Sequence, residues 1–246
     1  MTPSSPPGPW TGTVTHGGAL FSPAEASIVN PEFVDSYEVG VKGSTPDRRL
    51  SFEGAVFYYD FKDQQVSQLV PGSLVSLQSL TNAAKTRVYG AELEINAMPT
   101  DALFVQAKAG LLDAKFSEFL FDPSNPASSL AGNRTASSPK LTLAGLARYD
   151  IPLGAHTLGL QADGSYTGGH YFTPDNNPVI YENGYWLANT SVALRSANER
   201  YTVSLWVKNL FNEKYFVSGL ANASLGFNET FPGLPRTFGI TATGRF

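Results

Sequence analysis

The sequence contains no cysteine, which excludes a disulfide framework, a thiolate metal site and a cysteine nucleophile. Cysteine-free chains occur both in the bacterial envelope and in the cytosol, so this absence does not fix the compartment. The three histidines, His16, His156 and His170, lie far apart in the sequence and lack metal-ligand spacing. We therefore expect no metal site and no cofactor bound by the protein itself.

Long apolar runs are also missing. No stretch of about 18 consecutive apolar residues occurs, and the first residues, MTPSSPPGPW, lack the basic start and the apolar centre of a signal peptide. We expect neither a transmembrane helix nor an export signal in this sequence. Membrane-crossing strands are compatible with this absence, because alternation encodes them and they need no long apolar run.

Charge and catalytic motifs are sparse. Charged residues make up 15% of the chain, the formal net charge is −4, and no basic stripe with interleaved aromatics occurs, so we expect no nucleic-acid partner. A phosphate-binding glycine loop is absent, and in GSYTG (164–168) the serine is second rather than central, unlike a nucleophile elbow. Strand alternation by itself produces the spacing of Glu92 and Glu94. We therefore expect no enzymatic activity.

What the chain does contain favours strands and turns. It has 23 glycines, 11 tyrosines and 16 phenylalanines among 246 residues. Residues 1–35 are rich in proline, which predicts an irregular segment or a long extracellular loop. Residues 36–246 are expected to form one all-β region of about nine strands. The expected strands are 36–43, 49–68, 74–97, 102–118, 139–151, 156–172, 185–197, 200–217 and 236–246.

Alternation is clearest in 157–167, where Leu158 and Tyr166 fall on one face and Gln161 and Asp163 on the other. This two-residue period indicates strands rather than helices. Charged residues of the other strands keep to the second face, which predicts a polar wall in contact with water. The residues expected on this wall are Glu38, Lys42, Glu53, Glu92, Glu94, Lys108, Arg148, Asp163, Arg195, Lys208 and Arg245.

The expected connectors alternate in length. Turns such as 97–101 and 196–200 are short, whereas 119–138, 172–184 and 218–235 are long. Short turns at one end and long loops at the other are typical of outer-membrane barrels. Tyrosine and phenylalanine gather near the strand ends, where amphipathic rings suit the two membrane interfaces, although ordinary β-propensity and core packing also account for them.

Five segments stand out in order along the chain: NPEFVDSYEVGVKG (30–43), NAAKTRVYGAELEINAMP (82–99), SPKLTLAGLARYDIP (138–152), WVKNLFNEKY (206–215) and PGLPRTFGITATGRF (232–246). Taken together, they resemble the C-terminal part of TonB-dependent outer-membrane receptors. The resemblance implies a barrel of about 22 antiparallel strands around an N-terminal plug. The strands expected here would be the last of that barrel, so the expected fold is an antiparallel transmembrane β-barrel, present in part. We expect the plug, the coupling motif for the TonB protein and the earlier strands to be absent from this sequence.

The resemblance also implies a function. A complete receptor of this family lies in the outer membrane of Gram-negative bacteria, in contact with its lipid, and imports a ligand such as a ferric siderophore. The iron arrives inside the chelate, so no protein metal site is needed. The TonB inner-membrane complex would be a partner only where the missing plug region is present. Two alternatives stay open: a non-transporting structural or self-assembling outer-membrane barrel, and a soluble all-β binding module.

The last expected strand ends on an aromatic residue, Phe246. Before it, Phe238, Ile240 and Ala242 alternate with small or polar residues and are expected to face lipid. The resemblance implies that these four residues form the signal that the barrel-assembly machinery reads.

Ligand contacts are expected in the long loops, because loops carry recognition on a rigid scaffold. These loops mix aromatic residues with asparagine, aspartate, serine and arginine, a composition that suits a small polar ligand. We predict ligand contacts at Arg134, Tyr171, Tyr181 and Phe227.

Overall fold

The computed structural model describes residues 29–69, 78–198, 200–222 and 226–245. Regular structure in these residues is almost entirely β-strand, with two short 3-10 helices, η2 (Pro126–Ser128) and η3 (Pro178–Ile180). The all-β prediction is therefore confirmed. Among the described residues, no helix is long and apolar enough to cross a membrane. Phe246 and residues 1–28 of the proline-rich segment lie outside the described residues.

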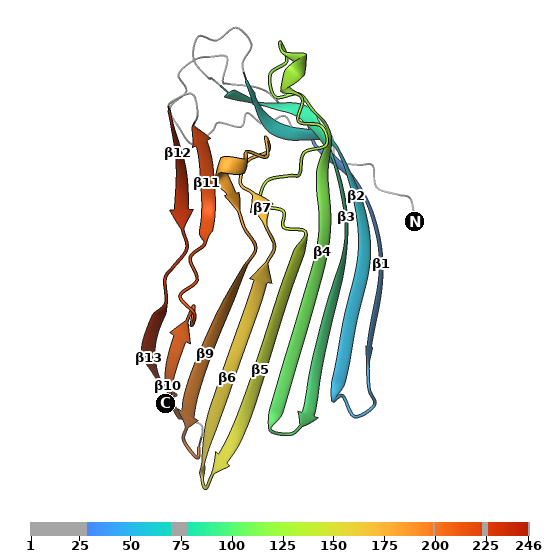
Figure 1. Cartoon of the computed structure of the whole chain (residues 1–246). Coiled ribbons are helices and arrows are strands. Elements are labelled where there is room, and N and C mark those ends of the chain that lie inside the picture. Colours follow the sequence, from blue (N-terminus) through green and yellow to red (C-terminus); the bar gives the residue numbers. More distant parts are fainter. Residues whose placement is uncertain (1–28, 70–77, 199, 223–225, 246) are drawn as a thin grey trace. The chain divides into compact units, whose positions relative to one another are not determined.

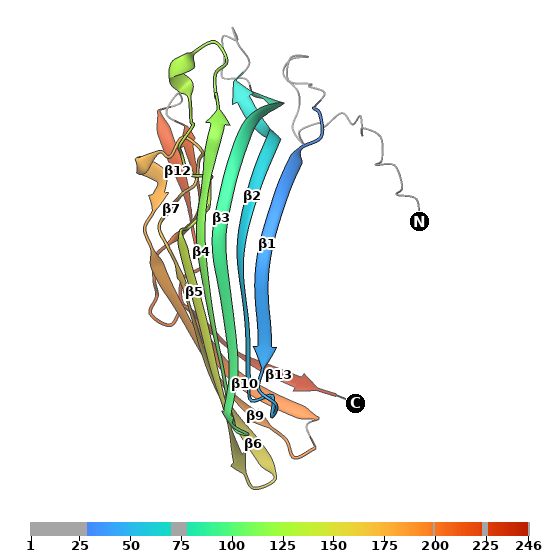
Figure 2. The same ribbon diagram turned by 90° about the vertical axis from the view of Figure 1, so that its right-hand side faces the viewer.

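Nine strands form one sheet whose neighbours follow chain order, with β1 and β13 as its two edges (Figures 1 and 2). Two small sheets, β7 with β8 and β11 with β12, lie in the connections between β6 and β9 and between β10 and β13. The strands of the main sheet are β1 (Phe33–Ser44), β2 (Leu50–Leu69), β3 (Gln78–Thr100), β4 (Leu103–Phe119), β5 (Leu141–Leu153), β6 (His156–Thr167), β9 (Tyr185–Arg195), β10 (Tyr201–Lys208) and β13 (Thr237–Gly244). The small sheets pair β7 (His170–Tyr171) with β8 (Tyr181–Glu182) and β11 (Phe216–Asn222) with β12 (Phe227–Pro232). The predicted partial, antiparallel barrel wall of nine strands is confirmed.

The chain divides into two compact units. The first unit comprises Met1–Tyr37, Tyr58–Tyr89 and Ala114–Thr135, and the second comprises Glu38–Phe57, Gly90–Asp113 and Ala136–Phe246. Strands β1, β2, β3 and β4 contribute residues to both units.

Two of the predicted strands are wrong in extent. The predicted strand 156–172 ends at Thr167, because Gly168 and Gly169 turn the chain into the small β7–β8 sheet. The predicted strand 200–217 is interrupted at Asn209, whose φ of 50° lies outside the extended region, and its last two residues belong to β11. The predicted loops 172–184 and 218–235 accordingly contain β8, β12 and most of β11.

Backbone pairing in the second unit separates two faces of the sheet. Tyr149 is opposite Leu160, which is opposite Val192, and the same row continues through Leu205 to Ile240. Because alternate residues of a strand point to opposite faces, these five side chains share one apolar face. Five residues predicted for the polar wall occupy the other face: Lys108, Arg148, Asp163, Arg195 and Lys208.

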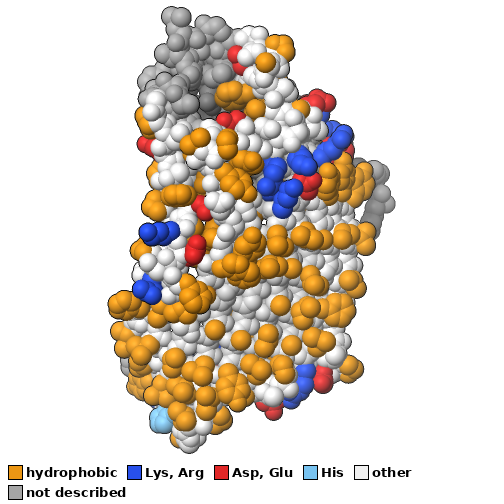
Figure 3. All heavy atoms as spheres, in the orientation of Figure 1, with side chains coloured by type: hydrophobic (Ala, Val, Ile, Leu, Met, Phe, Trp, Pro, Cys, Tyr) orange, Lys and Arg blue, Asp and Glu red, His pale blue; other side chains and the backbone are white. Residues whose placement is uncertain are grey.

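The apolar face is not covered by other parts of the second unit. Leu205, Ile240 and Phe238 are 60%, 67% and 80% exposed. In Figure 3, apolar side chains gather over β5, β6 and β9, and charged side chains lie mainly toward the edges of this region. A contiguous apolar surface of this kind needs apolar surroundings, which a lipid-facing barrel wall has.

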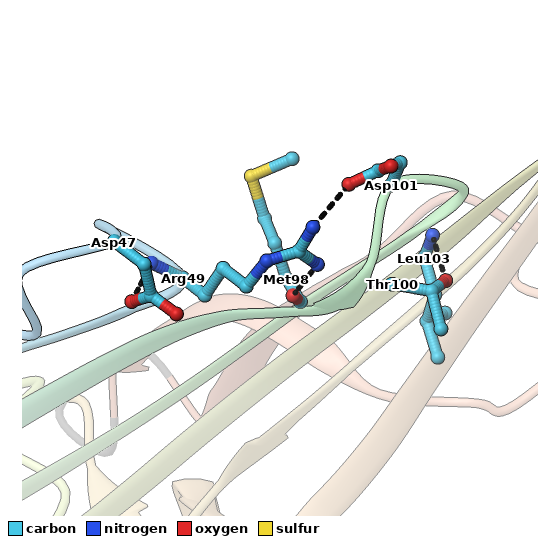
Figure 4. Close-up of polar contacts among 6 residues, drawn as sticks. All are labelled: Asp47, Arg49, Met98, Thr100, Asp101 and Leu103. Carbon is cyan, nitrogen blue, oxygen red and sulfur yellow. Dashed lines mark hydrogen bonds and ion pairs between the residues drawn. The ribbon is translucent and has the colours of Figure 1, made fainter.

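Short turns join β1 to β2, β3 to β4, β5 to β6 and β9 to β10, whereas long connections leave the other ends of these strands (Figure 1). This arrangement confirms the predicted asymmetry of the connectors. Two neighbouring turns are tied together by Arg49, whose guanidinium donates to the Met98 carbonyl at 3.2 Å and pairs with the Asp101 carboxylate (Figure 4). The Thr45 hydroxyl and the Arg49 amide donate to Asp47 and hold the pKa of that carboxyl below its ordinary value.

A glycine in β6 leaves room for an ion pair that crosses this strand on the polar wall. Arg195 of β9 reaches Asp150 of β5 over the intervening strand β6, where Gly159 is opposite Asp150. A Cβ on Gly159 would lie 3.1 Å from Asp150 Oδ1 and 3.3 Å from Arg195 Nη2. Glycine at this position therefore leaves the space that the ion pair occupies.

Replacing Gly159 with leucine is expected to lower the free energy of unfolding by about 1–3 kcal/mol, because the new side chain must displace Arg195 or Asp150. Urea unfolding of the chain in detergent micelles measures this change. Gly145→Leu is the matched control, since a Cβ there would have its nearest neighbour, Gln106 O, at 3.8 Å. Equal unfolding midpoints for the two variants would contradict the role assigned to Gly159.

Candidate functional site

The polar wall of the second unit presents a connected set of hydrogen-bonding groups. Glu94 pairs with Lys108 at 2.7 Å, and its Oε1 accepts hydrogen bonds from Asn96 at 2.9 Å and from Gln106 at 3.2 Å. Gln106 also donates to Asn96 Oδ1 at 2.7 Å. Alternation places these side chains together, since each lies two residues from another of them on its own strand.

This wall contains an open hollow of about 670 Å³ in the second unit. The predicted polar-wall residues Glu38, Glu53 and Glu92 line it together with Glu94 and Lys108. Carboxylates therefore outnumber the single lysine, and hydroxyl groups of Thr142, Ser165 and Thr167 also line the hollow. Such a surface can bind a polar partner by ionic and hydrogen bonds.

A second network joins the wall to the long connection after β10. Asn189 donates to Asp163 Oδ2 at 2.7 Å and accepts the Asn209 backbone N–H at 2.9 Å. The buried Asn209 side chain then donates to the carbonyls of Glu213 at 2.9 Å and Leu234 at 3.1 Å, while its Oδ1 accepts the Glu213 N–H at 2.8 Å. One asparagine thus fixes both ends of the segment that carries β11 and β12.

Asn212 supports the same turn from its other side. It adopts a φ of 54°, and its Oδ1 accepts the Arg236 N–H at 3.0 Å. Asparagine tolerates this left-handed conformation better than most residues. These roles of Asn209 and Asn212 were not predicted, although two asparagines three residues apart directly after a strand are a turn signal.

The two small sheets meet through apolar and polar contacts. Ile180 is 1% exposed, and its side chain and the Phe172 ring both lie close to Gly219 of β11. A Cβ on Gly219 would lie 2.9 Å from the Phe172 ring, so only glycine fits this contact. Next to this contact, the buried carboxylate of Glu182 accepts the Phe216 N–H at 2.8 Å. The connections 168–184 and 209–236 are therefore held to each other.

Two of the four predicted ligand contacts lie together. Tyr171 and Tyr181 are opposite each other in the β7–β8 pair, with ring centroids 4.8 Å apart. Phe227 opens β12, opposite Asn222, and is 46% exposed. Arg134 belongs to the first unit, where its backbone forms an isolated antiparallel β-bridge with Lys115. A role of these residues in ligand binding stays a prediction.

The loop that carries Arg134 is anchored in the first unit by its own apolar cluster. Phe116 and Phe119 of β4 are buried with Ala84 of β3, and Leu130 of the loop packs against them. At the start of the loop, the Ser124 hydroxyl and amide donate to Asp122 and hold the pKa of its carboxyl below the ordinary value. The loop is thus an ordered part of the first unit.

Among the residues that the structure describes, no group of three or more His, Cys, Asp or Glu side chains is arranged to hold a metal ion. The three residues Phe238, Ile240 and Ala242 of the predicted assembly signal lie in β13, opposite Val207, Leu205 and Val203. Their recognition by the assembly machinery stays a prediction, and Phe246 lies outside the described residues.

Comparison with known proteins identifies the family. Residues 5–210 match the family described as TonB dependent receptor-like, beta-barrel. The pesticin receptor of Yersinia pestis is 27% identical over 205 residues, which are 83% of this chain and 28% of that protein. The ferrichrome outer membrane transporter/phage receptor of Escherichia coli K12 is 30% identical over 230 residues, 90% of this chain and 28% of that protein.

A solved structure has the same fold. The ferric yersiniabactin uptake receptor FyuA from Yersinia pestis superposes with a TM-score of 0.73 at 24% identity, over 90% of this chain and 31% of that one. The chain belongs to the TonB-dependent receptor β-barrel family. It spans less than a third of the length of the relatives that it matches. Receptors of this family are outer-membrane proteins of Gram-negative bacteria, and this chain is accordingly an outer-membrane barrel segment.

Replacing Asn209 with alanine is expected to cost about 2–4 kcal/mol, because three hydrogen bonds are lost and alanine disfavours a positive φ. Asn209→Gly should cost less, since glycine accepts the backbone conformation. Hydrogen exchange of residues 209–236 reports the local loosening, and urea unfolding reports the total. The control is Asn198→Ala in the exposed β9–β10 turn. An equal effect of this substitution would contradict the role of Asn209 in fixing the segment 209–236.

Proposed function

We propose that this chain is the C-terminal wall of an outer-membrane receptor that imports a chelated metal, most simply a ferric siderophore, in a TonB-dependent manner. The observation that carries the proposal is the family match over residues 5–210. The similar proteins include the ferrichrome outer membrane transporter and the ferric yersiniabactin uptake receptor. In the complete protein, a plug would connect the barrel to the TonB complex of the inner membrane. The proposed role is transport and not catalysis.

The two faces of the second unit support this role. The apolar face suits lipid, and the polar wall suits a lumen that holds water, a plug and a passing ligand. Residues 36–246 form the barrel portion in this proposal, and residues 1–35 form a loop or irregular segment before it. The long connections would form the ligand entrance, with Tyr171 and Tyr181 as a fixed aromatic pair.

The two alternatives fit the structure less well. A barrel that closes with these nine strands alone would make β1 and β13 parallel neighbours, against the antiparallel pairing of this sheet. A soluble module would leave the row from Leu160 to Ile240 in water, at a large hydrophobic cost. A wall that is completed by further strands has neither problem.

A chimera tests the proposal. This chain replaces the matching C-terminal segment of the Escherichia coli ferrichrome transporter, and the chimera is expressed in cells that lack their own siderophore receptors. We expect uptake of radiolabelled iron from at least one of a panel of ferric siderophores, because the wall and loops complete a functional barrel. The uptake should be lost in otherwise identical cells without TonB.

The unmodified ferrichrome transporter is the positive control, and heat-modifiable migration of outer-membrane fractions shows that the chimera is folded. A folded chimera that imports none of the chelates would contradict the proposal. Uptake that persists without TonB would also contradict the proposal, because it would indicate passive leakage through an unplugged barrel rather than active import.

A further inference from the structure

Asn183 and Gly184 form the one asparagine–glycine step of the sequence. They are the two residues between β8 and β9 in the second unit, and both are exposed. In the described part of the chain, no residue forms a hydrogen bond with the Asn183 side chain or with the Gly184 amide. The side chain and the following backbone amide are thus both available to react, and glycine, which has no Cβ, allows their close approach.

Other asparagines of the second unit are held by hydrogen bonds. Asn189 donates to Asp163 at 2.7 Å, and Asn212 Oδ1 accepts a backbone N–H at 3.0 Å. The side chain of Asn209 has the three hydrogen bonds described above. A side-chain amide of this kind must break its hydrogen bonds before it can approach its own backbone, which slows any reaction between the two. Asn183 needs no such opening.

The aspartate–glycine step Asp163–Gly164 has the same kind of local sequence but a different setting. Gly164 lies within β6, opposite Gly145 on one side and Ala188 on the other. Asp163 Oδ2 accepts a hydrogen bond from the side chain of β9 described above. The ladder keeps this backbone extended and paired, so the Gly164 nitrogen cannot turn toward the carboxyl group. The asparagine–glycine step lies between strands and is free of this restraint.

Packing requires glycine at position 184. A Cβ there would overlap the hydroxyl group of Tyr166, the next residue but one to the end of β6. The Tyr166 ring is in turn held against Trp186 of β9, with centroids 5.0 Å apart. Any larger residue at position 184 must displace this aromatic pair. The structure therefore keeps the small residue that makes the step reactive.

We propose that Asn183 is a site of spontaneous deamidation, since asparagine is among the chemically labile residues. The Gly184 backbone nitrogen attacks the side-chain carbonyl carbon of Asn183, and an N–C bond forms. The side-chain nitrogen leaves as ammonia, taking up the proton of the attacking amide, and a five-membered cyclic imide remains. Water then opens this ring. Opening at the side-chain carbonyl gives aspartate, and opening at the main-chain carbonyl gives isoaspartate, whose backbone runs through the former side chain.

Both products act on the contact between the two long connections. Glu182, directly before the site, is buried, and its carboxylate accepts the Phe216 N–H at 2.8 Å. Aspartate at position 183 places a second negative charge beside this carboxylate. Isoaspartate adds an atom to the backbone of a connection that has only two residues, which displaces Glu182 from β9. Either change weakens the bond to Phe216, so the connection 168–184 loosens from β11 as the protein ages.

The test is incubation of the full chain, folded in detergent at neutral pH and physiological temperature, followed by peptide mapping with mass spectrometry. Deamidation raises the peptide mass by about one dalton, and an isoaspartate-specific methyltransferase labels the second product. We expect Asn183 to react at least about tenfold faster than Asn189, Asn209 or Asn212, because those side chains must first break hydrogen bonds. The Asp163–Gly164 step should give isoaspartate only in chain that is unfolded in urea.

Hydrogen exchange of the Phe216 amide measures the structural consequence. Exchange should be at least about tenfold faster in the aged chain than in the fresh chain, since one hydrogen bond is lost. Asn183→Gln cannot form the five-membered ring and should keep the fresh rate. The matched control, Asn228→Gln at an exposed asparagine of β12, should age like the unchanged chain.

Two outcomes would overturn the proposal. The first is equal conversion of Asn183 and Asn209 in the folded chain. The second is conversion of Asn183 with no faster exchange at Phe216. Both measurements use the isolated chain, so failure of iron uptake in the chimera would not affect them.

Discussion

The structure depends on one constraint: in hydrocarbon, backbone N–H and C=O groups must bond to each other, because water is absent. The nine-stranded sheet meets this requirement everywhere except at the outer edges of β1 and β13. Nine is an odd number, so both edge strands run in the same direction. Antiparallel pairing at both edges therefore needs an odd number of additional strands between them. A second copy of the chain, related by an axis normal to the membrane, would place its β1 parallel to β13 of the first copy. A longer receptor with an even number of strands would close with antiparallel pairing.

The same pairing decides which solvent each side chain meets. A one-residue shift of register would move every side chain to the other face, so the rows through Leu160 and Gln161 fix the apolar and polar faces together. On the polar face, the ion pairs of Arg195 and Lys108 cross between strands, and the pair of Arg195 with Asp150 occupies the space that Gly159 leaves. Ion pairs within the wall thus join Glu94 to Lys108 and Asp150 to Arg195, while the apolar face carries its exposed leucines and isoleucine.

The sequence alone predicts what depends on alternation and fails where tertiary contacts decide. The period of 157–167 predicts β6, its two faces and the polar position of Asp163, all of which are confirmed. The breaks at Gly168 and Asn209 were missed, because single turn residues inside a long alternating segment are weak local signals. The pairing of Tyr171 with Tyr181 was not predicted, because β7 and β8 have two residues each and are too short to show alternation.

The contact between the two long connections bears on recognition. Burial of a carboxylate is unfavourable unless hydrogen bonds satisfy it, and the buried Glu182 carboxylate accepts a hydrogen bond from the Phe216 N–H. Together with the packing of Ile180, this bond holds the connection 168–184 against the segment 209–236, whose two ends are joined by hydrogen bonds of Asn209. The aromatic pair on β7 and β8 is therefore presented by a body that is already assembled before any ligand arrives. Because preorganised groups lose little freedom on binding, a ligand that fits this surface keeps more of its interaction energy as affinity.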